Sequence, residues 1–184
     1  AGYQVPVRAE AEAWTLAGNP FPTAMNWDQK QSTDLSNTVY VYDHGSASFK
    51  TWNGETGSLT NGKIDAFQGF WVQNAPSISD SPELIFNSNA REKSAPFYKR
   101  SATQNPGTIA FKARMEDGRE SEAFLSFRHD GKWGADKRDA YKLQPLDAKP
   151  YLSMAFEEGG KQYEILNLPD SLVEEVQLPL TLSA

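Results

Sequence analysis

The segment MAFEEGGKQYEI, residues 154–165, carries the clearest fold signal in the chain. Apolar residues alternate with polar ones on both sides of its central Gly-Gly pair, which is typical of a two-residue hairpin turn. A turn at that pair sets Phe156 opposite Tyr163. The next facing pair is then Met154 with Ile165, so both strands have their apolar residues on one face. The segment therefore predicts an antiparallel β-hairpin.

A second hairpin is predicted around Asp117-Gly118. A two-residue loop there sets Met115 opposite Glu120, which places an acid on the apolar side of the sheet. A three-residue loop, Asp117-Gly118-Arg119, instead pairs apolar residues with one another. The facing pairs are then Ala113 with Ala123, Phe111 with Leu125, and Ile109 with Phe127. The sequence therefore favours the three-residue loop.

Similar patterns recur through the first half of the chain. The segment Val39-Tyr40-Val41-Tyr42 places valines on one face and tyrosines on the other, which predicts an interior strand. Asn53-Gly54 and Asn61-Gly62 are turn pairs between further apolar segments. The dominant period is two rather than 3.6. We therefore expect an all-β fold, an antiparallel, jelly-roll-like β-sandwich with little helix.

The number of domains depends on a polar segment in the middle of the chain. Residues 88–107 are rich in Ser, Asn, Lys, Arg and Pro. We interpret them as a crossover within a single β-sandwich domain that spans residues 1–184. The alternative is a linker between two small β domains, residues 1–87 and 108–184.

Composition excludes several functions. The formal charge of −6 argues against a nucleic-acid partner, which needs a concentrated basic face. No run approaches the roughly 20 apolar residues that span a bilayer, so we expect no membrane insertion. The chain has no cysteine, and disulfides are therefore absent.

Several motifs together resemble a known kind of bacterial module. They are WTLAGNPFP (14–22), NWD (26–28), YVYD (40–43), TWNG (51–54), FQGFWV (67–72), DAYKL (139–143) and ILNLP (165–169). In this order they are similar to β-sandwich modules of large secreted and cell-surface proteins of Bacteroidetes-type bacteria. There the module commonly precedes a C-terminal sorting domain of the type IX secretion pathway. The resemblance implies a secreted or cell-surface location and neighbouring domains in a larger parent chain, and it implies no particular chemistry.

Two tryptophans are candidate ligand-binding residues. An indole ring stacks on the apolar face of a sugar and donates a hydrogen bond to a hydroxyl. Trp52 lies beside Asn53-Gly54, and Trp133 lies between glycines, so both are candidates for a polysaccharide platform. The alternative is that both rings are buried, as expected for Trp71 in its apolar strand.

Three acids of one loop are candidate calcium ligands. Asp130, Asp136 and Asp139 supply the hard oxygen atoms that calcium prefers. Their spacing is not that of an EF-hand, and nearby lysine and arginine residues compete for the carboxylates. Turn hydrogen bonds and ion pairs are therefore the alternative role of these acids. No other cofactor is expected.

The sequence offers little catalytic chemistry. His44 and His129 are its only histidines, which excludes a three-histidine zinc site, and a cysteine nucleophile is excluded as well. Paired glycosidase carboxylates stay open, because their separation is spatial. We therefore expect a non-catalytic accessory module that binds polysaccharide or mediates adhesion. A structural spacer without a ligand is the alternative, and a glycoside hydrolase is a third hypothesis.

Overall fold

Strands dominate the computed structural model, which describes residues 2–79, 81–92, 107–146, 150–171 and 175–184. The first half contains β1 (Tyr3–Val5), β2 (Trp14–Gly18), β3 (Met25–Asn26), β4 (Lys30–Thr33), β5 (Leu35–Asp43), β6 (Ser48–Trp52), β7 (Lys63–Ile64), β8 (Gly69–Asn74) and β9 (Glu83–Phe86). The second half contains β10 (Thr108–Arg114), β11 (Glu120–Arg128), β12 (Ala140–Tyr141), β13 (Ser153–Glu158), β14 (Lys161–Pro169) and β15 (Leu180–Ser183). Three short 3-10 helices, η1 (Trp27–Gln29), η2 (Thr60–Gly62) and η3 (Ser88–Ala90), complete the regular structure of the described residues. The expectation of an all-β, sandwich-like fold is confirmed.

The first half forms a small sandwich around its own core. A four-stranded sheet in the order β2-β8-β5-β6 shares this core with the sheet β1-β9-β4 and the pair β3-β7. Trp27 is fully buried at its centre, where its ring contacts Phe70 and Phe86 with centroids 6.1 and 6.0 Å away. Alternating strand residues supply the rest of this first core, as period-two patterning requires.

The second half is one curled sheet in the order β10-β11-β14-β13-β15, with β12 also paired to β14. Most neighbours are antiparallel, but β11 and β14 run parallel. Phe156 and Leu166 are buried in an apolar cluster of this sheet. In the same cluster the Phe111 ring packs edge-on against the Phe156 ring, with their centroids 5.4 Å apart. These residues form a second core.

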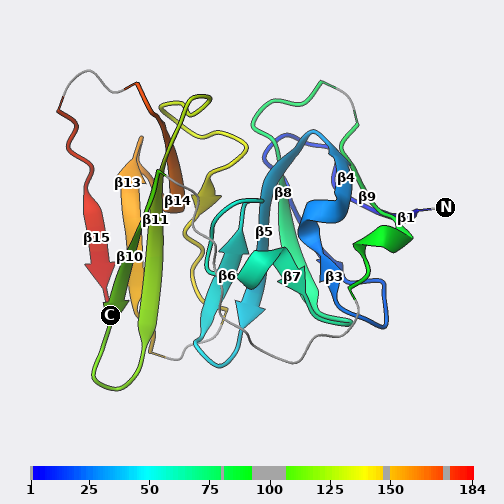
Figure 1. Ribbon diagram of the computed structural model, residues 1–184, viewed down its shortest axis with the longest axis horizontal. Coiled ribbons are helices and arrows are strands. Elements are labelled where there is room, and N and C mark those ends of the chain that lie inside the picture. Colours follow the sequence, from blue (N-terminus) through cyan, green and yellow to red (C-terminus); the bar gives the residue numbers. More distant parts are fainter. Residues whose placement is uncertain (1, 80, 93–106, 147–149, 172–174) are drawn as a thin grey trace.

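A third core joins the two halves, which lie side by side in Figure 1 with β5 and β6 facing the second half. The pattern of β5 explains this position, because Val39 and Val41 enter the first core while Tyr40 enters the third. Phe124 and Ile165 are the facing residues of the second half. The interior strand predicted from the valine–tyrosine alternation is therefore present, with an apolar core on each face.

The predicted Gly-Gly hairpin is partly confirmed. Phe156 faces Tyr163 as expected. The pairing of Met154 with Ile165 is wrong, because β13 separates from β14 beyond Phe156 and pairs with β15, where Met154 faces Leu182. The parallel strand β11 takes the vacated edge of β14, beginning at Ile165.

The second predicted hairpin has the expected faces and a different register. Met115 does not face Glu120, and apolar residues do share one side, as the sequence indicates. The register nevertheless differs by two residues, since Phe111 faces Ala123. Gly118 adopts a left-handed conformation with φ of 90°, which closes the turn one residue earlier than expected. A shift of two residues leaves every side chain on its face.

The polar crossover lies mostly outside the described residues, which stop at Glu92 and resume at Gly107. Its interpretation as a crossover or as a linker therefore stays a prediction. In the described part of the chain, no helix is long and apolar enough to cross a membrane.

Candidate functional site

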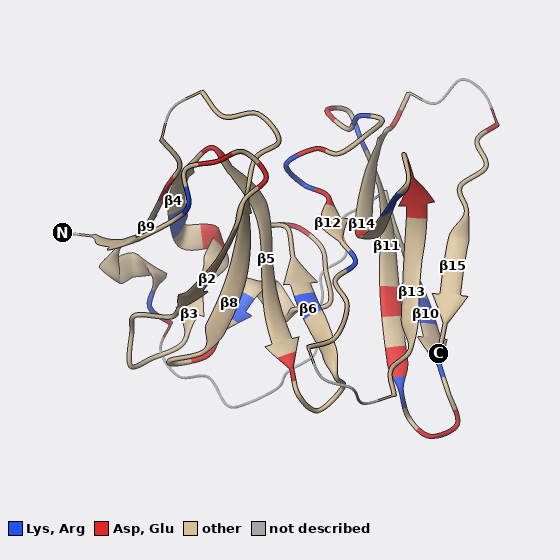
Figure 2. Cartoon of the chain, turned by 180° about the vertical axis from the view of Figure 1, so that it is seen from behind, with Lys and Arg blue, Asp and Glu red and all other residues tan. Residues whose placement is uncertain are grey.

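The loop between β11 and β12, residues 129–139, contains the most exposed tryptophan. Trp133 is 49% exposed, and the other four tryptophans of the chain are buried or half-buried. Figure 2 shows that this loop carries charges of both signs and lies beside the first half of the chain. It therefore presents a large aromatic ring within a polar surface.

Hydrogen bonds hold the middle of the loop and its C-terminal end. The Gly134 N–H donates to the Glu158 carboxylate at 3.2 Å, next to Trp133. The Lys137 carbonyl accepts the Asn37 N–H at 2.7 Å, and the Arg138 carbonyl accepts the Asn53 side-chain amide at 2.7 Å. The loop is thus bonded to the β13–β14 hairpin and to the first half. Because these contacts already order the loop, little conformational entropy is lost when a ligand binds.

Asp139 anchors the end of the loop. Its carboxylate accepts the Asn167 backbone N–H at 2.8 Å, the Asn167 side-chain amide at 3.1 Å and the Asp136 N–H at 2.8 Å. Burial, with a smaller effect of Asp136, raises the pKa of Asp139 to about 7. The three donors oppose this rise, because each favours the charged carboxylate.

The calcium candidates therefore have other partners. Asp130 pairs with Arg128 at 3.2 Å and with Arg138 at 3.3 Å, and the hydrogen bond from Arg128 lowers the pKa of Asp130. Asp136 and Asp139 accept hydrogen bonds within the loop and from β14. Among the described residues, no three acidic or histidine side chains are grouped to hold a metal ion. Turn hydrogen bonds and ion pairs, the alternative role of these acids, account for the contacts of all three.

The expectation that Trp52 presents its ring to solvent is wrong. Trp52 is 6% exposed and belongs to the first core. Its indole N–H donates to Asp28 at 2.9 Å, and its ring packs so closely on Gly62 that a Cβ there would lie 2.5 Å from the ring. The turn pair after Trp52 reverses the chain, but the loop of residues 60–62 covers the ring.

An ion-pair ring borders the loop. Glu55 of the first half pairs with both Arg128 and Arg138, and Asp130 pairs with the same two arginines. Carboxylates and guanidinium groups therefore alternate around a closed ring. All four side chains are partly exposed, so the ring positions the loop more than it stabilises the fold.

Sequence reasoning missed a buried ion pair where the two halves meet. Glu164 of β14 is 2% exposed and lies 3.0 Å from the Lys142 ammonium, which is 8% exposed. The hydroxyls of Thr51 and Ser58 donate to the other Glu164 oxygen at 2.6 Å each. The sequence does contain a signal for this pair, which is a glutamate inside the apolar segment Tyr163–Leu168. A charge in a buried strand needs a partner of opposite charge.

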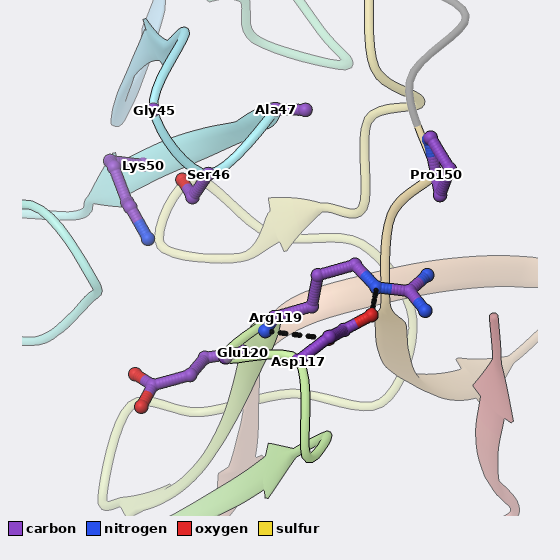
Figure 3. A pocket seen from close by; sticks show the side chains of 9 residues that line it. Gly45, Ser46, Ala47, Lys50, Asp117, Arg119, Glu120 and Pro150 are labelled. Atoms are coloured by element: carbon purple, nitrogen blue, oxygen red, sulfur yellow. Dashed lines mark hydrogen bonds and ion pairs between the residues drawn. The ribbon is translucent and has the colours of Figure 1, made fainter.

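A shallow groove of about 300 Å³ opens between the hairpin loops of the two halves (Figure 3). Lys50 lines it on one side and Asp117, Arg119 and Pro150 line the other. The Asp117 carboxylate holds Arg119 in two ways. It forms a 2.7 Å ion pair with the guanidinium group and accepts a hydrogen bond from the Arg119 backbone N–H. The groove is open and mixed in polarity, without the enclosed apolar lining typical of small-molecule sites.

Neither histidine has the setting of a general base for a nucleophile. The His44 ring packs edge-on against Tyr42 at 4.9 Å. The His129 side chain is fully exposed and lies 3.9 Å from Asp170. In the described residues neither ring has a hydrogen bond to a serine or threonine hydroxyl, the contact that activates such a nucleophile.

No protein-family model, curated protein or solved structure matches this chain.

Proposed function

We propose that this chain is a non-catalytic accessory module of a secreted or surface-attached protein, and that it contacts polysaccharide through Trp133. The observation that carries the proposal is a half-exposed indole ring on a loop that hydrogen bonds hold at Gly134 and at Arg138. The motif resemblance supports the secreted or cell-surface location.

The chemistry of the loop suits a sugar ligand. Trp133 offers an apolar face for the CH side of a pyranose. Lys132 and Lys137, both exposed, extend into solvent from the same loop and can donate to hydroxyl groups. Because the loop is already ordered, little conformational entropy is lost on binding.

A glycan screen with a matched pair of variants tests the proposal. Trp133→Ala removes the ring, and we expect polysaccharide affinity to fall about tenfold or more, since stacking rings contribute about 1 to 3 kcal/mol. The melting temperature stays close to that of the unchanged chain, because a half-exposed ring adds little to a core.

Phe67→Ala is the control, because Phe67 is a 75% exposed aromatic residue on a different turn. It leaves binding unchanged if Trp133 is the contact. An equal loss of affinity in both variants, or binding that survives Trp133→Ala, contradicts the proposal.

A structural spacer is the second candidate, favoured by the third core. Tyr40 and Phe49 from one half pack with Phe124 and Ile165 from the other, and the buried pair of Glu164 lies at the same boundary. Two halves joined in this way hold neighbouring domains at a fixed separation. If no polysaccharide binds the unchanged chain, this function is the better account.

A further inference from the structure

The chain contains two Asn-Gly pairs, and their asparagine side chains have different surroundings in the folded protein. Asn53 is 3% exposed, and its side-chain oxygen accepts the backbone N–H groups of Glu55 at 3.1 Å and Thr56 at 2.9 Å. Its side-chain amide donates to the Arg138 carbonyl at 2.7 Å. Three hydrogen bonds therefore fix the Asn53 side chain in a buried position.

Asn61, the asparagine of the second pair, is not held in this way. Its side chain is exposed, and no hydrogen bond joins it to another described residue. It lies in η2, a single 3-10 turn, where its φ of 50° and ψ of 31° are not helical. A short surface turn opens at a lower free-energy cost than a core strand. Asn61 can therefore change its conformation while the first sandwich stays folded.

An asparagine that precedes a glycine can react with its own backbone. The glycine nitrogen, after losing its proton to hydroxide, attacks the side-chain carbonyl carbon, and the side-chain nitrogen leaves as ammonia. The product is a cyclic imide, succinimide. Glycine favours this step because it has no Cβ beside the attacking nitrogen and lets the backbone rotate freely. Water then opens the ring at either carbonyl, which gives aspartate or isoaspartate.

We propose that Asn61-Gly62 is a self-modification site, at which the folded chain deamidates while Asn53-Gly54 stays intact. A bond forms between the Gly62 nitrogen and the Asn61 side-chain carbon, and the bond from that carbon to the amide nitrogen breaks. Ammonia is released, and hydrolysis of the ring consumes a water molecule. The selectivity comes from the hydrogen bonds of Asn53, because they must break before its side chain can reach the next backbone nitrogen.

The modification changes how the loop covers Trp52. Gly62 is buried, and a Cβ added to it would lie 2.5 Å from the Trp52 ring and 3.1 Å from the Trp27 Cβ. Isoaspartate carries the chain through its own Cβ and so adds an atom to the backbone next to Gly62. Closely packed groups cannot absorb such a change without moving. We therefore expect isoaspartate at position 61 to shift Gly62 away from the Trp52 ring.

Ageing of the full chain in mildly alkaline buffer, followed by peptide mapping with mass spectrometry, tests the proposal. Conversion replaces an amide by an acid, and the peptide gains the corresponding mass. We expect the peptide with Asn61 to convert at least about tenfold faster than the peptide with Asn53. Ageing in urea is the control, because unfolding removes the hydrogen bonds of Asn53 and the two peptides should then convert at similar rates.

Three results of this experiment would overturn the proposal. The first is equal conversion of the two peptides in the folded chain, and the second is faster conversion at Asn53. The third is an Asn61 that stays intact in the folded chain over a period in which it converts in urea.

Two variants separate the modification from its effect on packing. Asn61→Gln keeps an amide on a longer side chain that cannot close the same ring, so its peptide should keep its mass. Asn61→Asp adds the charge without the longer backbone, and before ageing it should melt close to the unchanged chain. The isoaspartate fraction of the aged chain should melt lower. A mass gain that persists in Asn61→Gln, or an isoaspartate fraction that melts like the unaged chain, contradicts the inference.

Discussion

Buried polar residues fix the loops whose tips are exposed. Asn19, 3% exposed, donates to the carbonyls of Thr23, Ile64 and Asp65 and so joins two loops of the first half. Asp139 joins the loop that contains Trp133 to β14, because its carboxylate accepts hydrogen bonds from the backbone N–H and the side-chain amide of Asn167. Each is a short polar side chain that accepts or donates several hydrogen bonds in place of water, so its replacement leaves buried groups unpaired.

Ionisation of Asp139 should make stability depend on pH. Its pKa is about 7 in the folded protein and 3.8 in an exposed carboxyl, so the folded state binds more protons between these values. The free energy of unfolding therefore falls as pH rises from about 4 through 7 and is then constant with respect to this group. Urea denaturation from pH 5 to pH 8 measures the fall, and Asp139→Asn should reduce it. An identical pH dependence in the two proteins contradicts the assignment.

At the level of elements, the sequence determines which residues share a face but not which strands meet. Val39 and Tyr40 could be assigned to opposite faces because alternation is a local property. The parallel pairing of β11 with β14 depends on segments distant in sequence, so no local pattern signals it. The burial of Trp52 depends on how the loop of residues 60–62 folds back over its ring, which the turn pair beside Trp52 does not indicate. For the same reason the exposure of Trp133 could only be proposed, while its anchoring by Asp139 could not be foreseen.

The β10–β11 turn should depend on Gly118. Gly118→Ala forces a Cβ into a left-handed conformation with φ of 90°, which we expect to lower the free energy of unfolding by about 1 kcal/mol. Gly18→Ala is the control, because Gly18 lies in a strand with open space around it and should be neutral or stabilising. Chemical denaturation of the dilute proteins measures both changes. Equal effects at the two positions contradict the role of the turn conformation.

At the level of the whole molecule, charges of different burial lie where the two halves meet. The Lys142–Glu164 pair of the second half is buried against Thr51 and Ser58 of the first half. The Glu12–Lys161 pair joins the two halves and has both side chains 49% exposed. Coulomb attraction between exposed ions is weakened by water, whereas an uncompensated buried ion is costly. Burial, rather than the number of ion pairs, therefore decides which contact matters.

Removing one partner of each pair tests this difference. Glu164→Gln leaves the Lys142 ammonium buried without its counter-ion, and we expect a loss of about 3 kcal/mol of unfolding free energy. Glu12→Gln should change it by less than about 0.5 kcal/mol. Adding Lys142→Met to Glu164→Gln should recover part of the loss, which denaturant titrations can measure. No recovery in the double variant indicates that the loss has another cause.

The strands of each half pair only within that half, among the described residues, and this affects how the chain folds while the ribosome synthesises it from the N-terminus. Within the described residues, β1 to β9 pair only with one another, so the first sandwich can form before the second half has left the ribosome. Until β11, β12 and β14 arrive, Tyr40 and Phe49 face water on the side of the nascent sheet that later becomes the third core. The half-synthesised chain is therefore most prone to aggregation during that interval, and slower translation after residue 92 prolongs it.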